Sequence, residues 1–330
     1  MIKNIAIAAG NAMNTIPLTF NEHQISRTVI GGRENNSENT LNISVILLNG
    51  SGSHFKVNIF ENLLQCNFRS VVSVEHDAQN RSIDDIAKKY PAVKFIVPLE
   101  KASDGELINL AMSEVDADYV LVLRDNLYIP SGIILPNLAE RLIKDDYYCV
   151  VPRLLDQNKN GIPTQFIPAV EKKHFTVEEI ASVTDGTKTI FPFDYIALYN
   201  RKKFIQLGGF DYTIQSPYWQ NLDLGLRSWL WGEQTRLTTM LHFSYVDQIP
   251  LEEKNFNLDY LRYHLKNEMP KFKNDRAYLS FFSFFTFRNH SSCGLLEARR
   301  QHQDAKKWVE KNRYKFKMDL TNFIENWSSL

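Results

Sequence analysis

An apolar run that ends in three polar residues limits the fold of this 330-residue chain more than any other segment. Residues 119–123, Tyr-Val-Leu-Val-Leu, have polar or charged neighbours on both sides. Such a run predicts a strand with both faces buried, which is typical of a parallel sheet covered by helices. Arg124, Asp125 and Asn126 then follow at the carboxyl end of the strand, where α/β proteins place their ligands.

Strands and helices alternate around this segment. The pattern predicts strands at 43–48, 70–74, 93–97, 147–152 and 193–199, and helices at 55–66, 82–90, 104–113, 137–144 and 201–207. Thr176-Val-Glu-Glu179 has the form of a capping box and predicts a further short helix. Because the connections are short, the predicted fold class is α/β, with a mostly parallel sheet flanked by helices.

The sequence divides into three predicted parts. Residues 1–40 form an N-terminal appendage with a short apolar strand at its start and a second possible strand at 24–30, and they end in a polar, glycine- and asparagine-rich linker. Residues 41–250 form the main domain, and residues 251–330 form a helical, aromatic and basic C-terminal extension.

Charge and cysteine content exclude several functions. Lys and Arg together number 38, as do Asp and Glu, so we expect no nucleic-acid partner. Cys66, Cys149 and Cys293 lie far apart, which argues against a disulfide framework and a zinc cluster. The start of the chain has no convincing signal sequence, and the most apolar window, 278–287, is too short to span a bilayer. We therefore expect a cytoplasmic protein.

Five landmarks occur in order along the chain. They are residues 44–47, residues 71–75, residues 104–109, Arg124-Asp125-Asn126, and the block Leu207-Gly-Gly-Phe-Asp211 followed by Gln220-Asn-Leu-Asp-Leu224, Arg227 and Gly232. Together they resemble the family 2 glycosyltransferases of the GT-A (Rossmann-like) fold over about residues 43–245. The resemblance implies inverting transfer of a sugar from a nucleotide-diphospho-sugar to a glycan, lipid-linked or protein acceptor. The nucleotide-sugar-binding residues that it implies are Leu48, Asn49, Glu75, Gly105, Arg124, Asp125 and Asn126.

Several carboxylates of that family are replaced here. The family's Asp-x-Asp falls on Arg124-Asp125-Asn126, and its Glu-Asp pair falls on Gln220 and Asn221. An amide cannot act as a base at neutral pH. If the protein is active, Asp223 or Asp211 would have to act as the base in place of Asn221. Asp211 could instead cap a turn, and Glu75 could be a solvated strand end.

Arg124 stands where the family holds a divalent metal. A guanidinium can pair with diphosphate oxygens and would repel a nearby cation, so we expect nucleotide binding that requires no metal cofactor. If Mn or Mg does bind, its expected ligands are Asp125, Asn126 and His242. The alternatives are that Arg124 turns outward to a surface acid and that His242 is a core residue.

Two further features leave alternatives open. Trp219 and Gln220 would suit an acceptor site because aromatic rings stack on sugars, although a core role for Trp219 is equally compatible with the sequence. Residues 278–317 combine phenylalanines with a basic stretch, which predicts peripheral contact with the inner face of a membrane. That stretch could also be a solvated helix face or the contact of a homo-oligomer.

The competing function is a catalytically inactive homologue that binds a nucleotide or glycan, or serves as a scaffold.

Overall fold

The computed structural model describes residues 23–32, 41–50, 56–76, 83–172, 174–181, 184–280, 283–284 and 294–330. The strands are β1 (Arg27–Gly31), β2 (Ile43–Asn49), β3 (Val71–Glu75), β4 (Val93–Pro98), β5 (Tyr119–Arg124), β6 (Leu127–Tyr128), β7 (Cys149–Leu155), β8 (Gln165–Glu171), β9 (His174–Ile180), β10 (Ala197–Asn200), β11 (Thr235–Tyr245), β12 (Lys271–Lys273) and β13 (Arg276–Tyr278). The helices are α1 (Lys56–Leu64), α2 (Ile83–Lys89), α3 (Asp104–Ser113), α4 (Pro136–Ile143), α5 (Arg201–Leu207), α6 (Pro217–Leu230), α7 (Leu258–Tyr263), α9 (Leu295–Asn312) and α10 (Leu320–Asn326), with a 3-10 turn η2 (Phe193–Tyr195) and a π-helical turn η3 (His264–Glu268).

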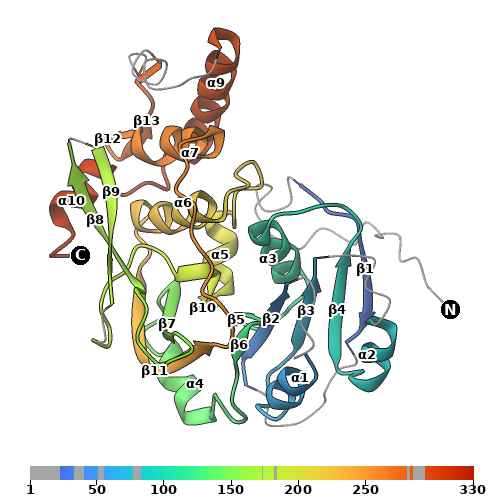
Figure 1. The fold of residues 1–330 in the computed structure, drawn as a ribbon. Coiled ribbons are helices and arrows are strands. Elements are labelled where there is room, and N and C mark those ends of the chain that lie inside the picture. Colours follow the sequence, from blue (N-terminus) through green and yellow to red (C-terminus); the bar gives the residue numbers. More distant parts are fainter. Residues whose placement is uncertain are drawn as a thin grey trace.

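Nine strands form one sheet in the order β1-β4-β3-β2-β5-β10-β7-β11-β6 (Figure 1). Strands β4, β3, β2 and β5 are parallel, and β11 is parallel to β7, whereas β1, β10 and β6 run antiparallel to their neighbours. The predicted α/β class with a mostly parallel sheet is therefore confirmed.

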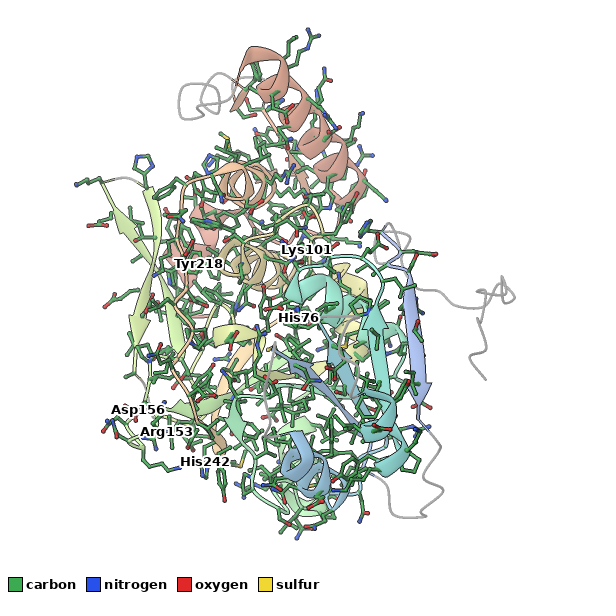
Figure 2. The ribbon with its side chains drawn as sticks, turned by 45° about the vertical axis from the view of Figure 1, so that its right-hand side comes forward. His76, Lys101, Arg153, Asp156, Tyr218 and His242 are labelled. Carbon is green, nitrogen blue, oxygen red and sulfur yellow. The ribbon has the colours of Figure 1, made fainter. Side chains whose placement is uncertain are left out.

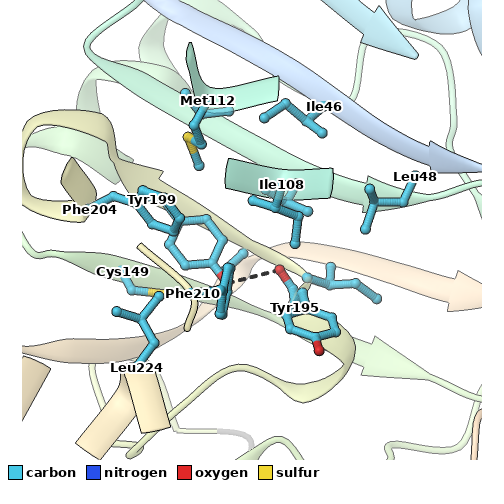
Figure 3. Packing of buried hydrophobic residues seen from close by; sticks show 14 of the residues in the cluster. Ile46, Leu48, Ile108, Met112, Cys149, Tyr195, Tyr199, Phe204, Phe210 and Leu224 are labelled. Atoms are coloured by element: carbon cyan, nitrogen blue, oxygen red, sulfur yellow. Dashed lines mark hydrogen bonds between the residues drawn. The ribbon is translucent and has the colours of Figure 1, made fainter. Parts of the chain in front are cut away.

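Helices cover both faces of this sheet. The connections through α1 and α2 step outward from β2 to β4, and the connection through α3 steps back to β5, so right-handed crossovers place α3 on the opposite face from α1 and α2. α3 and α5 both contact α6. Figure 3 shows the buried rings of Tyr195, Tyr199, Phe204 and Phe210 packed beside Ile108 and Met112. Because these side chains come from α3, α5, β10 and the loop before α6, this cluster fixes α6 against the sheet.

Strand register brings four of the predicted residues to one edge. Asn49 lies opposite Glu75 where β2 meets β3, and Leu48 lies opposite Arg124 where β2 meets β5. All five residues of β3 and all seven of β2 are buried, as expected for strands covered on both faces. The carboxyl ends of these strands therefore meet where the sequence predicts the site.

Two segments differ from the sequence-based predictions. The strand predicted at 193–199 begins with the 3-10 turn η2 and is extended only as β10. The helix predicted from Thr176-Val-Glu-Glu179 is wrong, because this segment is β9 and pairs antiparallel with β8. Phe175 and Val177, two residues apart on one face of the strand, are half-buried and pack on the core, so a strand period overrides the capping signal. The strand expected at 24–30 is present as β1, and it joins the main sheet through β4.

Beyond residue 250 the described residues form α7, η3, α9 and α10, together with one short hairpin. α9 rises from the body of the molecule at the top of Figure 1, and the short β12–β13 hairpin lies near its base. Of the helices in the described ranges, none has the length and apolar character needed to cross a membrane. Most of residues 1–40, residues 51–55, Ser82, most of the aromatic stretch 281–287 and Cys293 lie outside the described residues.

Candidate functional site

A cleft of about 630 Å³ opens beside the carboxyl end of β5. We call it the acidic cleft, because six carboxylates line it and Arg124 is the one Lys or Arg side chain among its described lining residues. The carboxylates are Asp104, Asp125, Asp194, Glu252, Glu253 and Asp259. Asp104 and Asp194 reach the cleft from segments that are distant from Asp125 in the sequence.

Arg124 points into this cleft and is held by two of its carboxylates. Its Nη2 lies 2.6 Å from Asp104 Oδ2 and 2.7 Å from Asp194 Oδ1. The guanidinium also lies 5.6 Å from the ring centroid of Tyr195. The side chain is only 14% exposed, so the alternative of an outward-turned arginine paired with a surface acid is not what the structure contains.

These ionic contacts shift the titration of all three groups. Burial opposes the charged form of Arg124, but the charges of Asp194 and Asp104 raise its pKa further above its usual range. Burial also opposes ionisation of Asp104, yet hydrogen bonding to His76 and the charge of Arg124 hold the pKa of Asp104 well below its usual range. Asp194 differs, because burial outweighs Arg124 and raises its pKa.

Asp194 sits on a strained backbone. Its φ is +50° and that of Tyr195 is +63°, a region that non-glycine residues enter rarely and that often marks functional sites. The Tyr245 hydroxyl donates to Asp194 Oδ2 at 3.1 Å, which with Arg124 fixes the carboxylate in the cleft. Sequence reasoning missed this residue, since no motif marks it.

The remaining two residues of the strand end bind the backbone around them. Asp125 Oδ2 accepts from Gly50 N at 3.1 Å, and the Asn126 carbonyl accepts from Val246 N at 2.9 Å. Asn126 Oδ1 is buried and has no hydrogen-bond partner in the described part of the chain. Both residues line the cleft, so the sequence-based grouping of Arg124 with Asp125 and Asn126 corresponds to one place in the structure.

Asn49 and Glu75 form a separate buried pair nearby. Asn49 Nδ2 donates to Glu75 Oε1 at 2.7 Å, and Ser73 Oγ donates to the same oxygen at 3.0 Å. Glu75 is 3% exposed and is therefore not a solvated strand end. Leu48 is fully buried in the core. The loops at 51–55 and 77–82, which follow these strands, lie outside the described residues.

Residues 246–257, which we call the strap, cross the cleft between β11 and α7 and contribute Glu252 to its wall. Burial raises the pKa of Glu252 to about 8, and the charges of Glu179 and Asp194 add to this shift. Trp219 Nε1 donates to the Asn255 carbonyl at 2.8 Å. Trp219, predicted as an acceptor residue, does not line the cleft itself but anchors the strap. No sequence motif pointed to Glu252.

The amide pair that replaces the family's Glu-Asp has two different environments. Gln220 is fully buried: its Oε1 accepts from Gly105 N at 3.0 Å and Tyr195 Oη at 3.1 Å, and its Nε2 donates to Ser103 Oγ at 3.0 Å and the Ile214 carbonyl at 2.7 Å. It joins α3 to α6 rather than facing an acceptor. The absence of a side chain at Gly105 permits this contact, because a Cβ there would lie 2.2 Å from Gln220 Oε1. Asn221 lines the cleft and donates to the Pro192 carbonyl.

The two predicted bases lie away from the cleft. Asp223 is 1% exposed and binds Arg227 at 2.6 Å and Asn267 Nδ2 at 2.6 Å. Asp211 pairs with Lys266 and accepts from Thr213 N at 2.9 Å. Neither carboxylate lines the acidic cleft, so neither is carried forward as the base.

His242 is not near the strand end that carries Asp125. It lies on the exposed face of β11, opposite Arg153 in the strand register. Figure 2 shows it beside Arg153 and Asp156 at the lower edge of the molecule, away from His76. The predicted ligand set of Asp125, Asn126 and His242 is therefore not brought together. His76, which no prediction included, instead places Nε2 3.0 Å from Asp104 Oδ1.

The side chains of the cleft do not fit a divalent ion as they stand. Such an ion needs several free oxygen ligands, whereas Arg124 holds Asp104 and Asp194. No group of three or more His, Cys, Asp or Glu in the described ranges is arranged to bind a metal. The guanidinium lies between the two carboxylates, in the position that a cation would need.

Comparison with known proteins supports the fold. No family model and no curated protein matches the sequence. The solved structure of GalNAc-T7 with UDP, GalNAc and Mn²⁺ matches with a TM-score of 0.59 at 12% identity, over 91% of this chain and 60% of that one. This chain thus spans about three fifths of the length of GalNAc-T7.

Two other solved structures match less closely. S. aureus TarS 1-349 gives a TM-score of 0.48 at 12% identity, covering 85% of this chain and 76% of that one. The mannosyltransferase PcManGT from Pyrobaculum calidifontis, in complex with GDP-Man and Mn²⁺, gives 0.45 at 10% identity, covering 82% and 72%. From the sheet order and the match to GalNAc-T7, the chain has the α/β fold of the GT-A glycosyltransferases.

Proposed function

We propose that this protein binds a nucleotide-diphospho-sugar in the acidic cleft and transfers the sugar to an acceptor hydroxyl. The observation that carries the proposal is that Arg124 and Glu252 line the same cavity at the carboxyl end of β5, within a GT-A fold. One is a buried cation and the other is a carboxyl group with a pKa of about 8. These are the two chemical requirements of the reaction, since the leaving diphosphate needs positive charge and the acceptor hydroxyl needs a base.

Arg124 supplies the positive charge in this proposal. Asp104 and Asp194 hold its Nη2. When the donor binds, a diphosphate oxygen would replace one of these two carboxylate oxygens as the partner of Nη2. A guanidinium suits that exchange because its five donors can serve a carboxylate and a phosphate together.

Glu252 acts as the base in the proposed transfer. The acceptor oxygen attacks the anomeric carbon, the bond from that carbon to the diphosphate oxygen breaks, and the hydroxyl proton moves to the Glu252 carboxylate. A base with a pKa near the working pH is efficient in this role. The strap brings Glu252 to the cleft and is tied down by Trp219, so the base is positioned by a segment outside the family motifs.

The proposed activity needs no divalent metal. GalNAc-T7 and PcManGT are described with Mn²⁺, whereas here Arg124 lies between the carboxylates that would otherwise be available to a cation. A catalytically inactive homologue that binds a nucleotide-sugar is the second candidate. It is favoured by the internal hydrogen bonds of Gln220 and by the ionic contacts of Arg124, which hold both side chains without a substrate.

A panel of nucleotide-diphospho-sugars tests the proposal. Calorimetry in EDTA measures donor binding, and chromatography measures nucleoside diphosphate release with and without simple sugar acceptors. We expect binding and release by the wild type, and binding without release by Glu252→Gln. His242→Ala, on the far exposed surface of β11, is the control and should match the wild type. Binding without release by the wild type would establish the inactive homologue, and absence of binding across the panel would refute both.

A further inference from the structure

A second pocket, of about 440 Å³, lies between α6, residues 211–213, α7, η3 and one face of α9. We call it the basic pocket, because six cationic side chains line it against two carboxylates, Asp211 and Asp304. The cationic residues are Arg227, Arg262, Lys266, Arg300, Lys307 and Lys311. Its volume lies within the range of ligand sites in proteins.

Several of the cations that line the basic pocket have carboxylate partners, and Arg262 lies 3.7 Å from Asp259. Arg227 pairs with Asp223 at 2.6 Å, and Lys266 pairs with Asp211. Arg300, Lys307 and Lys311 are exposed residues of α9, and their spacing of seven and four places them on one helix face. Lys307 lies 3.8 Å from Asp304, an exposed contact of little energetic weight. The six lining cations thus outnumber the four carboxylates named in these contacts, which are Asp211, Asp223, Asp259 and Asp304.

The inner wall also has more hydrogen-bond donors than acceptors. Arg227 is 4% exposed, and the Leu207 and Gly209 carbonyls fix its guanidinium at 2.6 and 2.9 Å. Its Nε nevertheless has no acceptor, and neither has Nε1 of Trp231, which is 9% exposed. Buried donors normally find a partner. These two donors are covered, so it is the cationic wall and the cationic rim of Arg300, Lys307 and Lys311 that are complementary to a ligand rich in negatively charged oxygens.

We propose that the basic pocket binds a phosphate-bearing ligand at a site separate from the acidic cleft. Phosphate matches both features, because its oxygens accept from several arginine and lysine donors together. The two sites share one short loop: residues 211–213 line the basic pocket, and Gln215 and Ser216 line the cleft. This loop connects the ligand site to the proposed reaction site, while the proposal itself does not depend on glycosyl transfer.

Calorimetry with inorganic pyrophosphate tests the proposal on the full chain. The double variant Arg300→Ala/Lys307→Ala removes two rim cations, and Arg299→Ala/Lys306→Ala is the matched control, because it removes two exposed cations of the same helix that do not line the pocket. We expect the rim variant to bind about tenfold or more weakly and the control to change by less than about twofold. Circular dichroism confirms that both variants are folded. Equal losses in both, or no pyrophosphate binding by the wild type, would overturn the proposal.

Two further arms locate the site and the source of the phosphate. Arg124→Ala should retain the pyrophosphate binding that the rim variant loses, and loss in Arg124→Ala alone would assign that binding to the cleft and refute the proposal. Flotation with phosphatidylglycerol vesicles identifies the source. Vesicle binding lost only in the rim variant supports a lipid phosphate, whereas pyrophosphate binding without vesicle binding supports a phosphate on a soluble ligand.

Discussion

The acidic cleft and the basic pocket lie at opposite ends of one helix and have opposite charge. Pro217 and Asn221, near the start of α6, line the cleft, whereas Arg227, near its end, lines the pocket. The cleft places one arginine among six carboxylates, and the pocket places six cations around two. α6 is buried along nearly its whole length, so it separates two chemical environments that side chains from other elements complete.

The structure places the motif residues of the block 207–232 differently from the sequence-based interpretation. Asp211 and Arg227 line the basic pocket, and Asp223 lies behind it, bound to Arg227. Of the cleft carboxylates, Asp125 directly follows β5, Asp104 lies in the first turn of α3, Asp194 lies in the strained turn before β10, and the others lie in the strap and in α7. The motif block therefore holds α6 in place, and the proposed chemistry depends on residues outside it.

The strongest test of this contrast is the titration of Glu252. Since burial raises its pKa to about 8, the fraction of Glu252 ionised, and with it kcat for nucleoside diphosphate release, should rise with pH through about 8. Glu252→Gln should lower kcat by roughly 100- to 10,000-fold and abolish this rise. A stopped-assay pH series on the wild type and the variant measures both effects.

Glu179 provides a control for that titration. Its charge adds to the raised pKa of Glu252, so Glu179→Gln should move the midpoint of the pH profile to lower pH while the maximal rate stays similar. Glu178→Gln is the matched variant, because adjacent strand residues point to opposite faces, and it should leave the profile unchanged. If neither substitution changed the midpoint of the pH profile, Glu252 would be excluded as the base of the proposed mechanism.

The next largest effect concerns Arg124. In EDTA, Arg124→Ala should weaken nucleotide-diphospho-sugar binding by roughly 10- to 100-fold, since a charged hydrogen-bonding group is lost. The same substitution frees Asp104 and Asp194, so added Mn²⁺ should recover affinity in the variant but have little effect on the wild type. Calorimetry with and without Mn²⁺ gives all four affinities.

Arg141→Ala, an exposed substitution on α4, controls for the loss of one positive charge in the Arg124 experiment. Its donor affinity should equal that of the wild type. A wild type that binds donor only with Mn²⁺ would contradict the assignment of Arg124 as the positive charge of the cleft, and the acidic cleft would then be a cation site.

Local patterns were sufficient to predict the fold and one edge of the site. The helix at 104–113 was predicted with its observed bounds, and the alternation of apolar strands with helices predicted the mostly parallel sheet whose strands carry Leu48, Asn49, Glu75 and Arg124. Asp194 and Glu252 could not be found in this way, because each reaches the cleft through a turn or strap whose path depends on tertiary packing. Asp223 was misplaced for a related reason: a matching motif position does not reveal that a buried arginine four residues later binds the carboxylate.

The smallest expected effect tests whether Asp211 stabilises the folded protein rather than taking part in the reaction of the acidic cleft. Burial disfavours its charge, but pairing with Lys266 lowers its pKa from 3.8 to about 2. A lowered pKa stabilises the folded state above the unfolded value, and this contribution is lost as the pH falls through about 2. Asp211→Asn should therefore reduce the free energy of unfolding at pH 7 by on the order of 2 kcal/mol, with the difference from the wild type shrinking below about pH 4. Urea denaturation at pH 7 and pH 3 measures this, with the exposed Asp304→Asn as control. If Asp211→Asn instead left stability unchanged and abolished nucleoside diphosphate release, Asp211 would belong with the acidic cleft, and the separation of the two sites by α6 would fail.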